Sequence, residues 1–261
     1  MEWSHQVSTE WLNARRDVVT ATELRDLLVG KTKWTKAQKA GTQVAPAFAA
    51  LWGQKHSIME PDPMSYGPAA RGHIMEPYAV QDYSMLNGDK WHHWDDCIIC
   101  NNGLGFSPDA MDIEQSPYAG VRCDVIKGKL MSGDMKYAAM PTSILEVKSY
   151  GIDNHMKNMV ANKMSLKERY QIAVAMMVIP TLKEGILVQY CPQLSEWSMY
   201  SHTYTRDELE KEIEELSEAL DMWNKTCRYF DSKTSEMEAT VSEMDVYDEY
   251  IASKQNNTLT F

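Results

Sequence analysis

The most constraining feature of the sequence is a short apolar segment that carries two opposite charges, ILEVK at residues 144–148. Its aliphatic and β-branched residues predict a strand over residues 143–150. Alternate side chains of a strand share a face, so Glu146 and Lys148 point the same way while the aliphatic residues on either side of Glu146 point into the core. A carboxylate and an ammonium are costly to bury unless a function uses them. Taken alone, the segment favours the simpler interpretation, a surface ion pair on an edge strand.

Strand-like and helical patterns alternate along the rest of the chain. Strand patterns occur at residues 95–101, 103–107, 120–126, 185–191 and 197–202. Apolar residues at helical spacing predict a helix over residues 69–85, and a second helix over residues 165–179 is closed by Pro180. Residues 52–68, rich in proline and glycine, predict an irregular loop. This order of elements predicts an α/β fold.

A further helix is predicted near the end of the chain. Thr205-x-x-Glu208 is a capping box, which opens a helix. We expect one domain over residues 1–230 and an acidic C-terminal tail over residues 231–261 that is either loosely docked or partly disordered. An apolar stripe on the helix predicts packing against the core, with an oligomer contact as the alternative, and consists of Leu209, Ile213, Leu216, Leu220 and Trp223.

The net charge of −11 is unevenly distributed. Residues 205–261 contain 15 acidic and 6 basic residues, whereas the first 204 residues contain 22 acidic and 20 basic residues. The body of the chain is therefore nearly neutral, and local basic clusters can still attract phosphate. Two basic runs occur, residues 31–39 with four lysines and Trp34, and residues 148–169. A solvated surface is the alternative interpretation of each run.

Composition excludes several classes of protein. With 44% hydrophobic and 24% charged residues, the chain is typical of a globular protein. No apolar run approaches the length of a membrane span, and the first residues lack the pattern of a secretory signal. Five cysteines, an odd number, favour reduced thiols in a cytoplasm. Cys97-x-x-Cys100 near His92 and His93 allows a zinc or iron–sulfur site, but no second pair completes four ligands, so a buried strand is the preferred interpretation.

A second carboxylate lies at the end of another predicted strand, where Asp109 follows Ser107-Pro108. Two carboxylates brought together with a lysine beside them make a site for a hard divalent cation such as Mg²⁺, which also binds water and substrate phosphate. The cation polarises the phosphate and helps to generate hydroxide, and the lysine orients or deprotonates that water. Asp109, Glu146 and Lys148 are therefore the candidate active site.

Two short motifs, SPD at residues 107–109 and EVK at residues 146–148, resemble the PD-(D/E)xK nuclease signature. More narrowly, the chain resembles the lambda-exonuclease family, the YqaJ-type viral recombinases. Three further stretches agree with that family in order: WLNARRDVVTATE at residues 11–23, RGHIMEPYA at residues 71–79 and YQIAVAMM at residues 170–177. The resemblance implies an α/β fold with a restriction-endonuclease-like core, in which helices flank a mixed central sheet on both faces and the carboxylates lie at one end.

The resemblance also implies roles in catalysis. Asp109 and Glu146 would bind the metal, with the backbone carbonyl of Val147 as an additional ligand. Glu76 would lie beside the metals, either as a further ligand or as a carboxylate next to the ligands. Lys148 would position or activate the attacking water. The implied cofactor is Mg²⁺, with Mn²⁺ as a substitute and two ions in the site.

The remaining implied roles concern orientation and DNA binding. Gln171 would orient the lysine or the water. Arg15, helped by Thr22, would meet the 5′ phosphate or scissile backbone of DNA. Lys33 and Lys36, in the first basic run, are further candidates for phosphate contacts.

Three departures separate this sequence from the family pattern. Ala110 follows the SPD motif where the family usually has glycine, and Ala173 stands where the family has a second helix glutamine. Between Asp109 and Glu146 lie 36 residues, which predicts an insertion at about residues 110–142. The insertion contains Asp124 in a strand-like run, so Asp124 is the reserve candidate for the first metal ligand.

The function implied by the resemblance is Mg²⁺-dependent digestion of one strand of linear double-stranded DNA from 5′ to 3′, which leaves 3′ single-stranded ends for phage-type recombination. Family members act as trimers around DNA, work with a single-strand annealing protein, and would operate in the cytoplasm of a bacterial host. Two alternatives stay open. One is an endonuclease or Cas4-like nuclease of the same superfamily, and the other is a non-catalytic DNA-binding protein on a nuclease fold.

Overall fold

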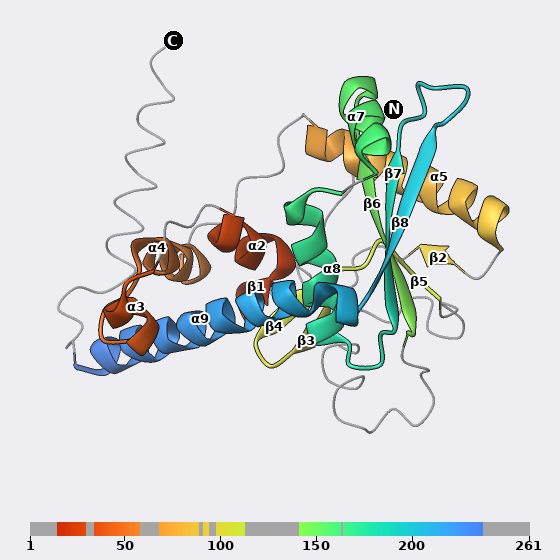
Figure 1. Cartoon of the computed structure of the whole chain (residues 1–261). Coiled ribbons are helices and arrows are strands. Elements are labelled where there is room, and N and C mark those ends of the chain that lie inside the picture. Colours follow the sequence, from red (N-terminus) through yellow and green to blue (C-terminus); the bar gives the residue numbers. More distant parts are fainter. Residues whose placement is uncertain are drawn as a thin grey trace, which may run out of the picture.

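The computed structural model describes residues 15–29, 34–57, 68–88, 91–93, 98–112, 141–162 and 164–236 (Figure 1). Lys33, Cys97, Asp124 and the strand predicted at residues 120–126 lie outside the described residues. The described strands form a five-stranded sheet and a three-stranded sheet, and helices pack on both.

The five-stranded sheet contains the charged apolar segment at residues 144–148. Its order is β2-β5-β6-β7-β8, in which β6 and β7 run parallel and the other neighbours run antiparallel. The sheet is therefore mixed, as predicted. Its strands are β2 (His92–His93), β5 (Ala110–Met111), β6 (Ser143–Ser149), β7 (Glu184–Tyr190) and β8 (Met199–Thr205).

The three-stranded sheet has the order β1-β4-β3. β1 pairs parallel with β4, and β3 pairs antiparallel with β4 across a turn in which Asn102 and Gly103 have positive φ angles. The strands are β1 (Val19–Thr20), β3 (Ile99–Asn101) and β4 (Leu104–Phe106).

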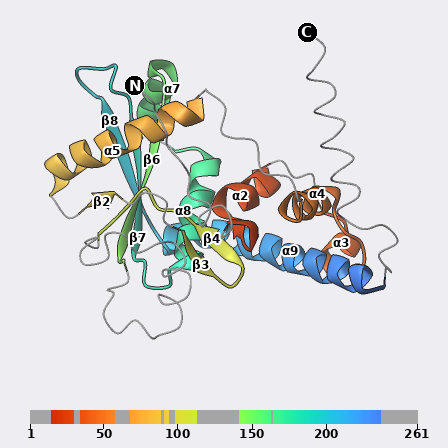
Figure 2. The same cartoon turned by 180° about the vertical axis from the view of Figure 1, so that it is seen from behind.

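Two helices cover opposite faces of the five-stranded sheet. Helix α5 (Pro68–Asn87) packs on the face that carries Leu145 and Val147, and Figure 2 shows it lying across the sheet. Helix α8 (Leu166–Val178) packs on the other face, where Ile144 joins the larger core. Gly185 of β7 permits this close approach, because a Cβ there would meet the Ile172 side chain at 2.3 Å. The sheet is thus covered on both faces, as predicted.

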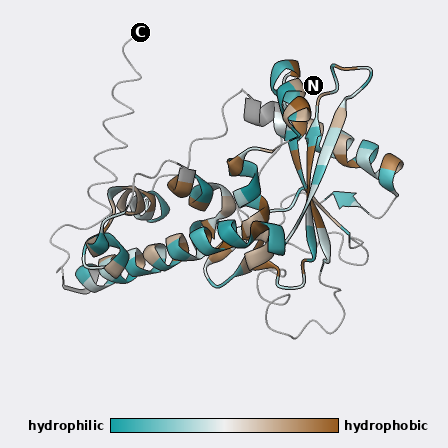
Figure 3. Ribbon diagram, in the orientation of Figure 1, coloured by the Kyte–Doolittle hydropathy of each residue, from teal (hydrophilic) through white to brown (hydrophobic). Residues whose placement is uncertain are grey.

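The C-terminal helix lies along the rest of the molecule. The Thr205 backbone N–H donates to Glu208, and the single turn η1 (Asp207–Leu209) leads into α9 (Glu210–Glu236). The apolar stripe of this helix packs against the core, which confirms the preferred interpretation, and Figure 3 shows hydrophobic and hydrophilic residues alternating along α9. The remaining helices are α2 (Ala21–Val29), α3 (Lys36–Ala40), α4 (Pro46–Lys55) and α7 (Ile152–Ala161).

Several predicted boundaries are confirmed, and the start of the predicted loop is wrong. The helices predicted at residues 69–85 and 165–179 correspond to α5 and α8, and Ser165 with Glu168 forms the capping box of α8. The loop predicted from residue 52 begins later, because α4 continues to Lys55 and buries Phe48 and Leu51 one turn apart. The chain remains helical in α9 to Glu236, and the rest of the acidic tail expected over residues 231–261 lies outside the described residues. None of the helices in the described part of the chain is long and apolar enough to cross a membrane.

Candidate active site

The strand register brings Asp109 beside Glu146. β5 pairs antiparallel with β6 so that Ala110 lies opposite Leu145, which places the preceding residue, Asp109, across from Glu146. Because β5 begins at Ala110, the backbone N–H of Val147 has no strand partner on that side. It donates instead to Oδ2 of Asp109 at 2.6 Å. The end of a short strand thus fixes the first carboxylate against the second.

Glu146 and Lys148 lie on the central strand of the five-stranded sheet, so the interpretation as a surface ion pair on an edge strand is wrong. Both side chains lie on the side of the strand opposite Leu145 and Val147, as the strand alternation predicts, but α8 covers that side as well. Glu146 is buried, and Lys148 is partly exposed. Nζ of Lys148 donates to Oε1 of Glu146 and lies 3.3 Å from the carbonyl oxygen of Val147.

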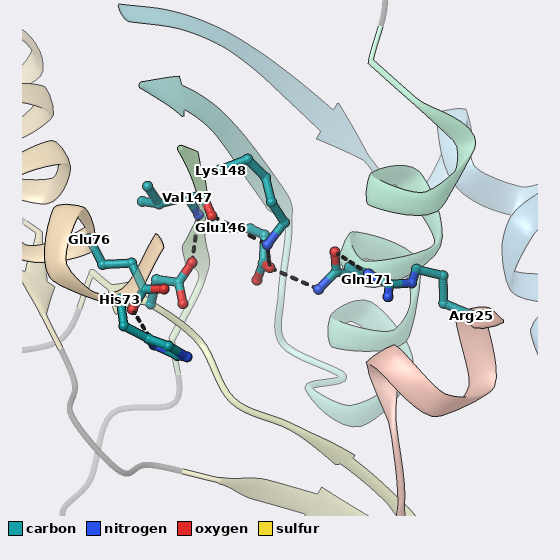
Figure 4. A network of polar contacts seen from close by, with 8 residues as sticks. Arg25, His73, Glu76, Glu146, Val147, Lys148 and Gln171 are labelled. Atoms are coloured by element: carbon teal, nitrogen blue, oxygen red, sulfur yellow. Dashed lines mark hydrogen bonds and ion pairs between the residues drawn. The ribbon is translucent and has the colours of Figure 1, made fainter. Parts of the chain in front are cut away.

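Gln171 reaches the same carboxylate from α8. Its Nε2 donates to Oε1 of Glu146 at 2.9 Å, and its Oε1 accepts from Nη1 of Arg25 on α2 at 3.1 Å. The resemblance implied that Gln171 orients the lysine or the water; in the structure it contacts the carboxylate to which Lys148 is bound. Figure 4 shows Glu76 and Gln171 on opposite sides of Glu146.

Glu76 comes from α5 and is joined to His73 one helical turn earlier, with Nδ1 of His73 3.3 Å from a carboxylate oxygen of Glu76. Pro77 follows directly and has no N–H to donate to the carbonyl of His73, so this turn lacks one helix hydrogen bond. Burial alone would raise the pKa of Glu76, but the hydrogen bond and charge of His73, with Lys148, bring it below its ordinary value. The bond to Glu76 raises the pKa of His73.

Asp109 is the carboxyl group of the cluster whose ionisation is least favourable. Burial raises the pKa of Asp109 well above its ordinary value, and the charges of Glu146 and Glu76 raise it further, against the opposing effects of Lys148 and the Val147 N–H. Burial by itself would lower the pKa of Lys148, but Glu146 and Asp109 outweigh it and raise that pKa. Three carboxylates therefore share one lysine, and the cluster is short of positive charge.

The donor set fits a hard divalent cation. Carboxylate oxygens are the ligands that Mg²⁺ and Mn²⁺ prefer. Among the described residues, no hydrogen bond reaches Oδ1 of Asp109 or Oε2 of Glu146, so one oxygen of each carboxylate is available. In the same part of the chain, no three His, Cys, Asp or Glu side chains converge closely enough to enclose an ion. The residues that would hold it are Asp109, Glu146, the carbonyl of Val147 and, from α5, Glu76.

Arg15 approaches the cluster from the segment before β1. Nζ of Lys55 donates to the backbone carbonyl of Arg15 at 2.9 Å and pairs with the Glu23 carboxylate. Burial lowers the pKa of Arg15, against the opposing charge of Glu23, and the positive charge of Arg15 in turn acts to lower the pKa of His73. Thr22 is exposed in the first turn of α2, one turn before Arg25.

Lys36, the described candidate from the first lysine run, does not lie at this cluster. Lys36 is exposed on α3, which lies at the far end of α9 from α5 and β6 in both views (Figures 1 and 2). Trp34 packs edge-on against Phe48 at 5.8 Å between ring centres, so it belongs to the core. Arg169, from the second run, pairs with Glu212 of α9 at 2.7 Å.

The described residues of the alternative metal site, Cys100, His92 and His93, are divided between two sheets. Cys100 is buried in β3 of the three-stranded sheet, whereas His92 and His93 form β2 of the five-stranded sheet. Of the strand predicted at residues 95–101, residues 99–101 form β3, and the first two of them are buried. For this part of the segment, the preferred interpretation as a buried strand is confirmed.

Comparison with known proteins places these residues within a family. The model of the YqaJ-like viral recombinase domain matches residues 10–184, two-thirds of the chain. The chain belongs to the YqaJ-like viral recombinase family. The matched residues include every member of the cluster from Arg15 to Gln171, whereas β8 and α9 of this YqaJ-like chain lie beyond them. No curated protein matches the chain.

Solved structures confirm the predicted α/β nuclease fold for this YqaJ-like protein. It is similar to the alkaline exonuclease LHK-Exo from Laribacter hongkongensis, with 19% identity and a TM-score of 0.57 over 88% of this chain and 100% of that chain. LHK-Exo in complex with dAMP gives a TM-score of 0.58 with the same identity and coverage. A phage-related exonuclease from Haemophilus somnus 129PT gives 12% identity and a TM-score of 0.52 over 84% of this chain and 99% of that chain.

Three polar residues of the YqaJ-like site are not predicted from the sequence: Arg25, His73 and Glu168. Burial raises the pKa of the Glu168 carboxyl, which also lies within electrostatic reach of Lys148, Arg25 and Glu146. His73 and Glu168 each stand three residues before a predicted site residue on the same helix, so helical spacing is a signal that could have found them. Arg25 stands three residues after Thr22 on α2, but its contact with a residue 146 positions away has no signal in the sequence.

Proposed function

We propose that this chain is a metal-dependent DNA exonuclease that digests one strand of linear duplex DNA from 5′ to 3′. The observation that carries the proposal is the register of β5 on β6, which sets Asp109 beside Glu146 and Lys148 in a chain of the YqaJ-like family. Membership of the family and likeness to exonuclease structures support a nuclease. Strand polarity and the choice of metal rest on the resemblance of the motifs.

The proposed reaction is hydrolysis of one phosphodiester. Water adds its oxygen to phosphorus, the bond from phosphorus to O3′ breaks, and a proton goes to the departing O3′. Lys148 lies between Glu146 and the carbonyl of Val147 and holds the attacking water at this edge of the cluster. Gln171 keeps the Glu146 carboxylate in place through its amide N–H.

Mg²⁺ is the proposed cofactor, with Mn²⁺ as a substitute and two ions in the site. When bound, divalent cations neutralise charge on the scissile phosphate and favour deprotonation of the attacking water. Asp109, Glu146, the Val147 carbonyl and Glu76 supply the oxygen ligands, with Asp124 as the reserve for the first ligand. Positive charge there also offsets the burial and the neighbouring carboxylates that raise the pKa of Asp109.

End recognition falls to Arg15, helped by Thr22 of α2. A guanidinium suits bidentate capture of phosphate. Cleavage at P–O3′ releases a nucleoside 5′-monophosphate and leaves a new 5′ phosphate on the strand, so each turnover recreates the group that Arg15 recognises. A monophosphate product has the chemistry of the dAMP in the LHK-Exo complex. By resemblance we also propose a homotrimer, a single-strand annealing partner, and a site of action in a bacterial host cytoplasm.

The test is incubation of the purified protein with linear and with circular duplex DNA, with and without Mg²⁺. We expect loss of linear DNA alone, in the presence of metal, with release of mononucleotides. Cutting of circles would instead indicate an endonuclease or Cas4-like nuclease. No metal-dependent loss of either substrate, with binding retained, would indicate a non-catalytic DNA-binding protein.

A further inference from the structure

A row of polar side chains runs from α2 through α8 to the central strand. Nη1 of Arg25 donates to Oε1 of Gln171 at 3.1 Å, and Nε2 of Gln171 donates to Oε1 of Glu146 at 2.9 Å (Figure 4). Lys148 binds the same oxygen of Glu146. The proposed function uses the last three residues of this row and leaves Arg25 without a role.

Arg25 decides which way the Gln171 amide faces. An amide can present either its oxygen or its nitrogen to a neighbour, whereas a guanidinium has no acceptor. Arg25 therefore holds the amide oxygen on its own side and turns the N–H group toward Glu146. Gln171 is buried, so a flipped amide would set its oxygen against a buried carboxylate and lose both hydrogen bonds.

The amide in turn decides which oxygen of Glu146 is free. Gln171 and Lys148 both donate to Oε1, and no donor among the described residues reaches Oε2. The guanidinium is itself held, because Nε of Arg25 pairs with Asp26 at 2.9 Å and the side chain is largely buried. Each link in the row is thus fixed by the one behind it.

We propose that Arg25 is a positioning residue for the Glu146 carboxylate and acts through Gln171. The inference rests on the proposed function, since Glu146 is there a metal-binding and catalytic group. Arg25 itself contacts neither the reacting atoms nor the metal ligands. The competing role is a direct contact between Arg25 and a DNA phosphate, which would not require Gln171.

A double-mutant cycle separates these two roles, with Arg25→Met, Gln171→Met and the double variant assayed on linear 5′-phosphorylated duplex DNA with Mg²⁺. We expect each single variant to lower kcat about tenfold with little change in KM, which is the scale of one hydrogen bond to a charged group. The double variant should be no slower than Gln171→Met alone, because Arg25 has nothing left to orient. Arg25→Lys should recover part of the rate, and Arg228→Met, which removes an exposed arginine from α9, should match the wild type.

Two measurements do not depend on activity. Mn²⁺ titration should show weaker binding in Arg25→Met and no additional weakening in the double variant. Urea unfolding in EDTA should show the two single substitutions to be non-additive. Losses that multiply in the double variant, or a higher KM at unchanged kcat in Arg25→Met, would overturn the proposal in favour of a phosphate contact. If the wild type shows no metal-dependent hydrolysis, the proposed function fails, while additive unfolding would refute the Arg25–Gln171 coupling separately.

Discussion

Two lysine–glutamate ion pairs of this molecule contain the same chemical groups in opposite surroundings. Lys148 and Glu146 lie on the central strand, with side chains 26% and 5% exposed. Lys39 and Glu218 join α3 to α9 at the other end of the molecule, with side chains 50% and 43% exposed. The outer pair remains solvated, whereas the inner pair has lost much of its water and has further carboxylates as neighbours.

The difference shows where the fold tolerates unfavourable electrostatics. At the α3–α9 end, charges pair in solvent and contribute little to stability. Around β6, Asp109 and Glu76 crowd the inner pair and one lysine serves three acids. A structural role does not require that crowding, because apolar residues would pack β6 between α5 and α8 at lower cost. The proposed hydrolysis of a phosphodiester would use it, because divalent cations bind to gathered carboxylates. Changing matching residues at the two ends of the molecule tests this comparison.

The largest expected effect follows from removing one of the carboxylates proposed to bind metal. Glu146→Ala or Asp109→Ala should lower the rate of hydrolysis by about a thousandfold or more, since metal assistance contributes several kcal/mol to the barrier. Glu218→Ala should leave the rate unchanged. The measurement is release of acid-soluble nucleotide from linear duplex DNA with Mg²⁺. An active Asp109→Ala together with an inactive Asp124→Ala would transfer the first ligand to Asp124.

The lysines of the two pairs should differ in the same way. Lys148→Met should lower kcat by about 10²–10⁴, the range for loss of a residue that handles the attacking water, while DNA affinity changes little. Lys39→Met, its exposed counterpart, should retain both values. Single-turnover rates and equilibrium DNA binding distinguish the two quantities. Equal losses of rate and affinity in Lys148→Met would make this lysine a phosphate contact.

Arg15 and its exposed neighbour Arg16 should differ in their effect on the recognition of DNA ends. Arg15→Met should reduce the preference for 5′-phosphorylated over 5′-hydroxyl ends by about tenfold to a hundredfold, because a charged hydrogen-bond donor to the phosphate is lost. Arg16→Met, which changes the exposed neighbour, should keep the preference. Digestion of the two substrates by each variant measures the ratio. An unchanged ratio in Arg15→Met would remove this residue from end recognition.

A pH-dependent stability difference follows from the burial of Asp109 and the carboxylates around it. The pKa of Asp109 is raised in the folded protein, so the folded state binds its proton more tightly than the unfolded chain and loses stability as the pH rises through the raised pKa. Asp109→Asn cannot ionise, and its side-chain oxygen can still accept from Val147. In EDTA this variant should be more stable than the wild type by an amount that grows from pH 5 to pH 8.

Metal should reverse that order at neutral pH, because saturating Mg²⁺ stabilises the protein that binds it. The free energy of urea unfolding, measured in EDTA and in Mg²⁺ at several pH values, gives both comparisons. A difference between the two proteins that stays constant with pH would show that Asp109 ionises normally in the folded state.

The smallest effect is expected at the exposed pair. Lys39→Met or Glu218→Gln should change the free energy of unfolding by no more than about 0.5 kcal/mol, and added salt should shrink even that difference. Thermal unfolding at low and at high salt measures it. A loss of several kcal/mol would mean that the α3–α9 contact depends on this pair, and the contrast with β6 would disappear.

Local patterns predicted much of the fold. The strand at residues 143–150, the helix over residues 165–179, the helical start that follows Thr205 and the apolar stripe of α9 all depend on residues a few positions apart, and the structure confirms them. The predicted start of the loop at residue 52 was wrong, because the prediction rested on the prolines and glycines that follow. Helix α4 extends to Lys55 because Phe48 and Leu51 are buried against partners that are distant in the sequence.

For the candidate site, too, local motifs predicted some features, whereas features that depend on distant partners were not predicted. Asp109, Glu146 and Lys148 were found because their motifs are contiguous in sequence, and their proximity follows from a strand register that the chain between them does not reveal. Whether β6 is central or at an edge depends on which strands pair with it, so the simpler interpretation of the ion pair could not be rejected from residues alone. Arg25 was missed because its partner lies on another helix.

The most direct test of the central claim is titration of Mn²⁺ into the metal-free wild type, Glu146→Gln and Glu218→Gln proteins, followed by electron paramagnetic resonance of the free ion. The claim is that the inner pair is retained because its surroundings bind a divalent cation, whereas the outer pair has no such use. We expect the wild type and Glu218→Gln to bind Mn²⁺ equally, and Glu146→Gln to bind at least about tenfold more weakly. Equal binding by Glu146→Gln, or no binding by the wild type, would contradict it.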